Sequence, residues 1–206
     1  MTVISIKPGN AKDIQRIELA DGSLFSFKTY YLPDNAELGE GLELNTDEEE
    51  NLRFAAACLR AEKAALQLIA RAEQTVFNLS MKLEKRGHES SCVRAVMAHL
   101  CESGLLDDSR YARLWLESRI SRQASSPRRL RAALHSRGID RNDSDTALKE
   151  TLDDETEQQL LERYVKKIKS KFDNSAENQR SLKYTLKSEG FSSAAIQYYF
   201  EKRELI

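Results

Sequence analysis

One helical frame occurs three times along the chain and constrains its fold more than any other feature. Each copy has a small polar residue, then Leu four positions on, Leu four further and Gly four beyond that. The copies, 51 and then 52 residues apart, are Thr75, Leu79, Leu83, Gly87; Ser126, Leu130, Leu134, Gly138; and Asn178, Leu182, Leu186, Gly190. A fold built from three copies of one structural unit is therefore expected.

Each position of the frame has a physical role in a short helix. A Thr, Ser or Asn side chain at the first position can accept a hydrogen bond from an orphan N–H at a helix start. In the second copy Pro127 follows at the first helical position, where a Pro loses no hydrogen bond. The two Leu lie one turn apart on one face, and Gly adopts the left-handed conformation that ends many helices. The frame predicts three amphipathic helices with buried Leu.

Apolar residues at helical spacing flank each copy and predict one helix before it and one after it. Three-helix units of this size have small cores and must stack, as in other repeat arrays. A capping box is expected at Thr46 and Glu49. We predict a connecting helix at 47–60, followed by three-helix repeats at 61–106, 107–153 and 154–206 in an elongated, curved array.

The N-terminal segment, residues 1–46, has a strand pattern instead. Ile4 and Ile6 alternate with polar residues, and the Asp21-Gly22 pair is a turn signal between two further alternating runs. A three-residue loop at 21–23 gives the cross-strand pairs Leu19 with Phe25 and Ile17 with Phe27. Because an isolated hairpin is marginal in water, this module must pack on the helices. The sequence predicts a mainly α protein with a small N-terminal β-hairpin module.

Composition narrows the class of protein. The chain is 40% hydrophobic and 32% charged, as a soluble helix-rich globular protein would be. No apolar run reaches the ~18 residues of a membrane span, and the N-terminus lacks the features of a signal peptide. The three Cys form no CxxC pair, which indicates reduced thiols. We expect a cytoplasmic protein without membrane contact, and a monomer.

Charge is unevenly distributed along the chain. The 206 residues include 32 basic and 33 acidic side chains. The first 50 residues have 4 basic and 11 acidic side chains, and the other residues have 28 basic and 22 acidic ones. Residues 109–138 contain eight Arg and a single acid, Glu117. An acidic N-terminal region therefore precedes a basic body, which favours an anionic partner.

A run of charge is usually a solvated helix face. Here, however, the eight Arg would repel one another unless an anion or an acidic surface faced them, and Arg suits bidentate pairing with phosphate or carboxylate. We therefore predict a partner-binding patch at Arg110, Arg113, Arg119, Arg122, Arg128, Arg129 and Arg131. An extension of the patch is predicted at Lys82, Lys85, Arg86, Lys166 and Lys169.

Other chemistry has little support in the sequence. Tyr111, Trp115 and Tyr164 could stack on bases, but their helical spacing with aliphatic neighbours favours a place in the core. The His and Cys residues between 88 and 101 lack zinc-finger spacing, so no metal is expected. No Gly-rich phosphate loop, Ser-His-Asp order or paired-carboxylate motif occurs. We expect neither enzymatic activity nor a cofactor.

Two stretches carry a resemblance to a known family. LLDDSRYARLW at 105–115 and PRRLRAALHSRGI at 127–139, together with the triplicated frame and the hairpin-then-helix head, resemble the RecX family, bacterial regulators of the RecA recombinase. The resemblance covers essentially the whole chain. It implies three tandem three-helix repeats and binding to the RecA–DNA filament. It also implies inhibition of recombinase activities, including ATP hydrolysis and strand exchange.

The chain departs from the family pattern at two positions. Ser126 stands where the family usually has Gly before the Pro, and it preserves helix capping. His88 follows the first frame Gly, where the family favours an apolar residue. Three hypotheses remain open: a regulator of the RecA filament, a DNA-binding module whose three-helix repeats grip duplex directly, and a scaffold without nucleic-acid contact. The partners that we expect are the RecA filament and single- and double-stranded DNA.

Overall fold

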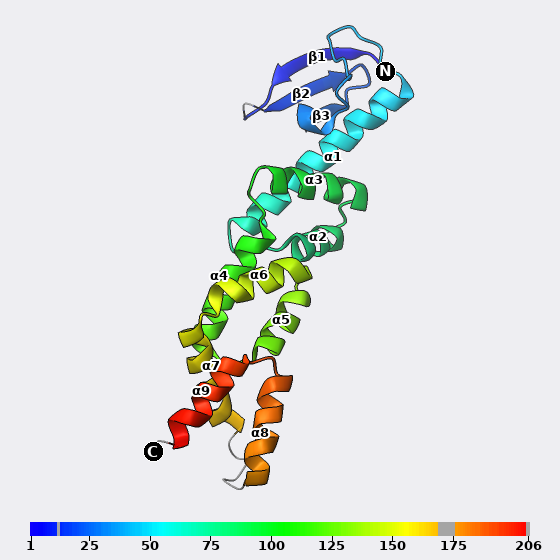
Figure 1. Ribbon diagram of the computed structural model, residues 1–206. Coiled ribbons are helices and arrows are strands. Elements are labelled where there is room, and N and C mark those ends of the chain that lie inside the picture. Colours follow the sequence, from blue (N-terminus) through cyan, green and yellow to red (C-terminus); the bar gives the residue numbers. More distant parts are fainter. Residues whose placement is uncertain (12, 169–175, 205–206) are drawn as a thin grey trace. The chain divides into compact units, whose positions relative to one another are not determined.

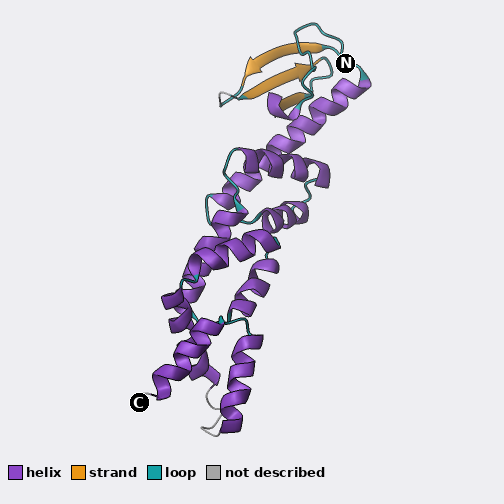
Figure 2. Ribbon diagram, in the orientation of Figure 1, coloured by secondary structure: helices purple, strands orange, loops and turns teal. Residues whose placement is uncertain are grey.

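The computed structural model describes residues 1–11, 13–168 and 176–204 (Figure 1). It divides the chain into two compact units, Met1–Leu106 and Asp107–Ile206. Helices make up most of both units, and among the described residues named strands occur only in the first unit (Figure 2). The predicted fold class, mainly α with a small N-terminal β module, is confirmed.

The β module is an antiparallel sheet with the strand order β1-β2-β3. Strand β1 spans Val3–Pro8, β2 spans Ile14–Leu19 and β3 spans Leu24–Lys28. The predicted hairpin corresponds to β2 and β3, and β1 adds a third strand along β2. A short 3-10 turn, η1, follows at Thr29–Tyr31.

The register of the hairpin differs by two residues from the predicted one. Ile17 lies opposite Phe25, the residue that had been expected to face Leu19. Gly22 decides the register: its φ is +83°, and its N–H donates to the Leu19 carbonyl at 2.9 Å. A left-handed Gly belongs at the last position of a three-residue hairpin loop, so the loop is 20–22. Because the shift is two residues, each side chain stays on its predicted face.

Helix α1, Thr46–Ile69, is one uninterrupted helix. Its capping box joins Asn45 and Glu48, one residue before the predicted pair of Thr46 and Glu49. Asn is at least as good an N-cap as Thr, and the acidic run supplies a Glu at either spacing. No break separates the predicted connecting helix from the first repeat, because this stretch is rich in Ala, Leu and Glu and has no Gly or Pro.

The remaining helices follow the predicted order. In the first unit they are α2, Val76–Lys85, and α3, Ser90–Glu102. In the second unit they are α4, Asp108–Arg122; α5, Pro127–His135; α6, Arg141–Thr151; α7, Asp154–Ile168; α8, Ala176–Ser188; and α9, Ser193–Glu204. The frame helices are α2, α5 and α8, each with one helix before it and one after it. The residue boundaries of the three repeats stay a prediction.

Two of the three predicted N-caps are confirmed. The Thr75 side chain accepts a hydrogen bond from the N–H of Asn78, and the Ser126 side chain accepts one from the N–H of Arg129. The third, at Asn178, is wrong, because α8 begins at Ala176 and Asn178 lies inside its first turn. The two residues before Asn178 are Ala and Glu, which favour helix and suit a helix start.

The three frame glycines end their helices in the same way. Their φ angles are +85°, +82° and +86°, and the residue after each Gly donates its N–H to the carbonyl of the second frame Leu. These hydrogen bonds run from His88 to Leu83 at 3.2 Å, from Ile139 to Leu134 at 3.3 Å and from Phe191 to Leu186 at 3.2 Å. This is the Schellman arrangement. Ile139 and Phe191 are buried while His88 is half-buried, so the residue after the Gly is less completely packed in the first copy.

Each unit has its own core. In the first, Val3, Ile17 and Phe27 of the sheet join buried residues of α1, α2 and α3, so the β module packs on the helices as predicted. In the second, buried residues of α4 to α9 form one cluster. Tyr164 is buried within this cluster and the half-buried Tyr111 and Trp115 pack against it, which confirms their predicted place in the core.

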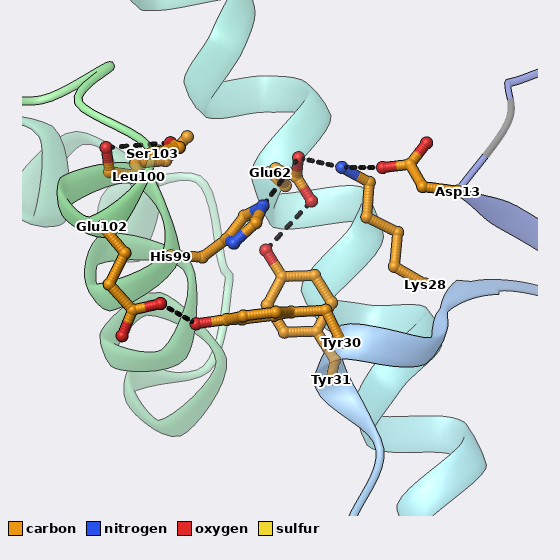
Figure 3. A network of polar contacts seen from close by, with 9 residues as sticks. All are labelled: Asp13, Lys28, Tyr30, Tyr31, Glu62, His99, Leu100, Glu102 and Ser103. Atoms are coloured by element: carbon orange, nitrogen blue, oxygen red, sulfur yellow. Dashed lines mark hydrogen bonds and ion pairs between the residues drawn. The ribbon is translucent and has the colours of Figure 1, made fainter. Parts of the chain in front are cut away.

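A buried carboxylate holds the sheet to the helices (Figure 3). The side chain of Glu62, on α1, is only 4% exposed. Its carboxylate accepts hydrogen bonds from Lys28 Nζ at 2.6 Å and from Tyr31 Oη at 2.9 Å, and His99 Nε2 of α3 lies 3.9 Å away. Lys28 also pairs with Asp13 at 2.6 Å.

We call this cluster of Asp13, Lys28, Tyr31, Glu62 and His99 the Glu62 clamp. Burial lowers the pKa of the Lys28 ammonium, but the hydrogen bonds and charges of Asp13 and Glu62 outweigh it, so that pKa lies above its usual value. Burial raises the pKa of the Tyr31 hydroxyl, and the negative charge of the nearby Glu62 carboxylate raises it further. Tyr31 therefore stays a neutral hydrogen-bond donor to Glu62 at physiological pH.

We predict that Lys28→Met destabilises the protein by about 3 kcal/mol, because it leaves the buried Glu62 carboxylate without its cation. Urea denaturation followed by circular dichroism measures the change. The matched control is Lys63→Met, which removes an exposed ammonium from the residue next to Glu62 on α1 and should change stability by less than about 0.5 kcal/mol. Equal stabilities for the two variants would contradict the clamp.

We also predict that Gly87→Ala lowers the free energy of unfolding by about 1 kcal/mol. The left-handed φ of +85° is strained for any residue that has a Cβ. An added Cβ at Gly87 meets nothing within 4 Å, so no steric clash contributes. Gly39 has the same open surroundings without a positive φ, and Gly39→Ala should keep stability or raise it by about 0.5 kcal/mol. Urea denaturation compares them, and similar losses in both variants would refute the role of Gly87.

Candidate functional site

The predicted Arg patch lies on two helices of the second unit. Arg110, Arg113, Arg119 and Arg122 are on α4, and Arg128, Arg129 and Arg131 are on α5. The α4 side chains have separate neighbours: Arg113 lies 3.5 Å from Glu150, and the Arg119 guanidinium lies 5.8 Å from the centre of the Trp115 ring. Arg110 is half-buried and Arg122 is exposed near the helix end.

Two of the three predicted Arg of α5, Arg128 and Arg131, line a pocket between α5 and α6. Its volume is about 540 Å³, and its lining residues are Arg128, Arg131, Ala132, His135, Arg141, Ser144 and Asp145. Among the described residues, the exposed Arg128 side chain has no hydrogen bond or ion pair. Two residues of the predicted patch, Arg128 and Arg131, are thus brought together with a third Arg and a His that the prediction did not include.

Asp145 organises the cations of this α5–α6 pocket. One of its carboxylate oxygens accepts a hydrogen bond from Arg131 Nε at 2.6 Å, and the other lies 3.7 Å from Arg141 Nε. The hydrogen bond from Arg131, with the charges of both guanidinium groups, holds the pKa of the Asp145 carboxyl below its usual value. Three Arg and one ionised Asp leave the pocket with a net charge of about +2, which suits an anion.

The end of α8 fixes the start of α5. The N–H of Arg128 donates to the carbonyl of Glu189 at 3.0 Å, and the hydroxyl of Ser126 donates to the Glu189 carboxylate. Arg129 Nε lies 3.6 Å from the same carboxylate, although the Arg129 side chain is 62% exposed. The family departure at Ser126 therefore keeps the cap and adds a contact to Glu189. Arg128 is held in place by its backbone while its guanidinium stays free.

The predicted extension does not join this pocket in the described residues. Lys82, on α2, donates to Gln74 Oε1 at 2.6 Å, and Lys85 and Arg86 are exposed at the end of that helix. Lys166 is exposed on α7 and is not among the pocket residues. Lys169 lies outside the described residues. Arg163, a further cation of α7, donates to the carbonyl groups of Ser121 and Ile120 at the end of α4.

Sequence reasoning missed His135 at the end of α5 and the residues of the pocket that α6 supplies. His135, Arg141 and Asp145 occur singly in the sequence and match no motif. Ser144 could have been noticed, because the frame offset places it where the other two copies have Val93 and Ile196. A polar residue at a position that is otherwise apolar is a signal of a special site.

Comparison with known proteins agrees with this architecture. Residues 107–148 match the family model described as RecX, second three-helix domain. The regulatory protein RecX of Treponema pallidum (strain Nichols) is 35% identical over 125 residues, which are 60% of this chain and 76% of that protein. The regulatory protein RecX of Ectopseudomonas mendocina (strain ymp) is 33% identical over 134 residues. These are 65% of this chain and 88% of that protein.

The chain belongs to the RecX family. A crystal structure of a regulatory protein RecX has the same fold, with a TM-score of 0.68 at 21% identity over 95% of this chain and 97% of that one. The crystal structure of RecX from Lactobacillus salivarius matches with a TM-score of 0.60 at 22% identity. The match covers 73% of this chain and 98% of that one. The segment that matches the second RecX domain contains all the residues of the α5–α6 pocket.

Neither a membrane-spanning helix nor a group of metal ligands occurs among the described residues of this RecX-family chain. No helix among them combines the length and apolar character that crossing a bilayer requires. Within the same residues, no three His, Cys, Asp or Glu side chains are grouped closely enough to hold a metal ion. The α5–α6 pocket, which brings Arg128 and Arg131 of the predicted patch together, is the candidate site.

Proposed function

We propose that this RecX-family chain binds the RecA–DNA filament and inhibits the recombinase, its ATP hydrolysis and its strand exchange. It thereby modulates homologous recombination and DNA repair. It acts in the cytoplasm as a monomer, through binding and without catalysis of its own. The partners are the RecA filament and the single- or double-stranded DNA within it.

The observation that carries the proposal is the exposed cationic surface of α5 inside the segment that matches a RecX domain. A RecA–DNA filament offers DNA phosphates and protein carboxylates in a regular array. Exposed guanidinium groups suit both, because they bind either anion in a bidentate manner. Arg128 supports the proposal most directly, since its backbone is fixed by Glu189 and its side chain is available.

Inhibition follows from occupancy of the filament surface. A bound chain fills space that an incoming subunit or a second DNA strand must enter, and it opposes the rearrangements of the hydrolysis cycle. A ligand that prefers one state of the filament shifts its equilibrium by the difference in affinity. No reaction on this chain is required.

Direct DNA binding without RecA is the second candidate function. The excess of cations in the α5–α6 pocket favours it, because phosphate contacts alone give sequence-independent affinity. In that case the logarithm of the binding constant falls steeply with the logarithm of salt concentration whether or not RecA is present. Saturation in proportion to RecA subunits supports the filament instead.

The test is single-strand-dependent ATP hydrolysis by RecA with this chain titrated from far below to above the RecA concentration. We predict inhibition by the wild type and at least about tenfold weaker inhibition by Arg128→Glu/Arg131→Glu, because two positive charges become negative at the binding surface. Circular dichroism should show unchanged helix content. The control Lys63→Glu/Arg94→Glu reverses two exposed charges of the first unit and should inhibit like the wild type.

Two results would count against the proposal. Absence of inhibition at every ratio, with a folded chain, rejects RecA regulation and leaves direct DNA binding to be tested. Equal inhibition by the wild type and by Arg128→Glu/Arg131→Glu rejects the placement of the contact on α5.

A further inference from the structure

The pocket between α5 and α6 has a counterpart between α8 and α9. That second pocket is lined by Lys183, Lys187, Ser193, Ile196, Gln197, Phe200 and Glu201. The first five of these lie 52 residues after Arg131, His135, Arg141, Ser144 and Asp145, which is the offset between the second and third frame copies. The repeat therefore places the same pocket twice in the second unit, and both copies contain cations.

The first copy of the frame differs in charge at these positions. An offset of 51 residues gives Ser80, Glu84, Ser90, Val93 and Arg94. Here Glu84 replaces the His or Lys of the other copies, and the Ser90 hydroxyl donates to its carboxylate at 3.1 Å. The cationic pocket is thus a property of the second and third copies and is not required by the helical frame itself.

Ser144 distinguishes the α5–α6 pocket from its counterpart. Val93 and Ile196 occupy the same position in the other copies, are buried and are 1% and 9% exposed. Ser144 is 1% exposed, and its hydroxyl has no hydrogen-bond partner among the described residues. A buried hydroxyl without a partner destabilises a fold, because it has lost its water. Ser144 is also one of the residues that line the pocket with three Arg.

We infer that the α5–α6 pocket is an oxyanion site that receives a backbone phosphate of DNA. The inference rests on the proposed function, in which DNA is one of the two surfaces contacted. Arg128 supplies an uncommitted guanidinium, and Ser144 supplies the hydroxyl that lacks a partner. Asp145 holds Arg131 and Arg141 by their Nε atoms, which leaves their terminal nitrogens for the ligand.

Recurrence of the pocket favours a phosphate over the carboxylate of a protein partner. The two copies lie in successive repeats of one unit, so a ligand that uses both must carry the same anionic group at intervals. A polynucleotide backbone has this property along its whole length. Its non-bridging oxygens can accept hydrogen bonds from several guanidinium groups and from a hydroxyl at once.

The test uses the full chain without RecA and a fluorescein-labelled single-stranded 40-nucleotide DNA, with fluorescence anisotropy as the readout. Ser144→Val removes the hydroxyl and installs the residue that the first copy has at this position. We predict about tenfold weaker DNA binding, because one hydrogen bond to a charged group is lost. The melting temperature should be equal or higher, because an unpaired buried hydroxyl is gone. Ser144→Ala repeats the test with a smaller side chain.

Arg128→Gln tests the cation of the same pocket. We predict weaker DNA binding and a slope of log affinity against log salt that is smaller by about one, as for the loss of one phosphate contact. The matched control is Arg94→Gln, which removes one exposed positive charge from α3 at the position equivalent to Asp145. It should change DNA affinity by less than about twofold and leave the slope unchanged.

The outcomes separate this inference from the proposed function. Wild-type DNA affinity in all three pocket variants, or no DNA binding by the wild type, overturns the phosphate site. If these variants bind DNA normally but fail to inhibit RecA, the pocket holds a protein carboxylate, and only the proposed function survives. If they lose DNA affinity while the wild type never inhibits RecA, the phosphate site stands and the proposed function fails.

Discussion

The way in which each frame helix ends is the constraint on which the rest of the structure depends. A Gly with a left-handed backbone turns the chain, and the next N–H closes on the carbonyl of the second frame Leu. The second frame Leu therefore has two roles: its side chain is buried in the core, and its carbonyl accepts the hydrogen bond that ends the helix. This holds for Leu83, Leu134 and Leu186. The following helix starts at the same point in each copy, so equivalent residues return to equivalent places.

Equivalent places do not carry equivalent chemistry. The frame Leu and Gly are the same in all copies, while the positions that line the pocket differ: Glu84 of the first copy stands where the second and third copies have His135 and Lys187. Ser144 is the clearest case, because a core position became polar beside a cationic pocket. The packing of the frame residues determines where the pocket lies, and the side chains at the variable positions determine its charge.

The sequence predicted the frame helices, the N-caps at Thr75 and Ser126 and the buried aromatics, because these depend on local spacing. The prediction was wrong where two neighbouring arrangements are both locally possible. Asn45, and not Thr46, caps α1, and Gly22 is the last residue of its hairpin loop and not the middle one. It could not reveal the Glu62 clamp or the α6 side of the pocket. Those contacts join residues that are distant in sequence and match no motif.

We propose that the α5–α6 face of the second unit contacts the RecA–DNA filament. Hydrogen–deuterium exchange of this chain, alone and bound to RecA on single-stranded DNA, tests it most directly. We predict slower exchange across residues 123–145, which contain the start of α5 and the pocket, and little change in the β module. Unchanged exchange across 123–145, with protection confined to the first unit, would contradict the claim.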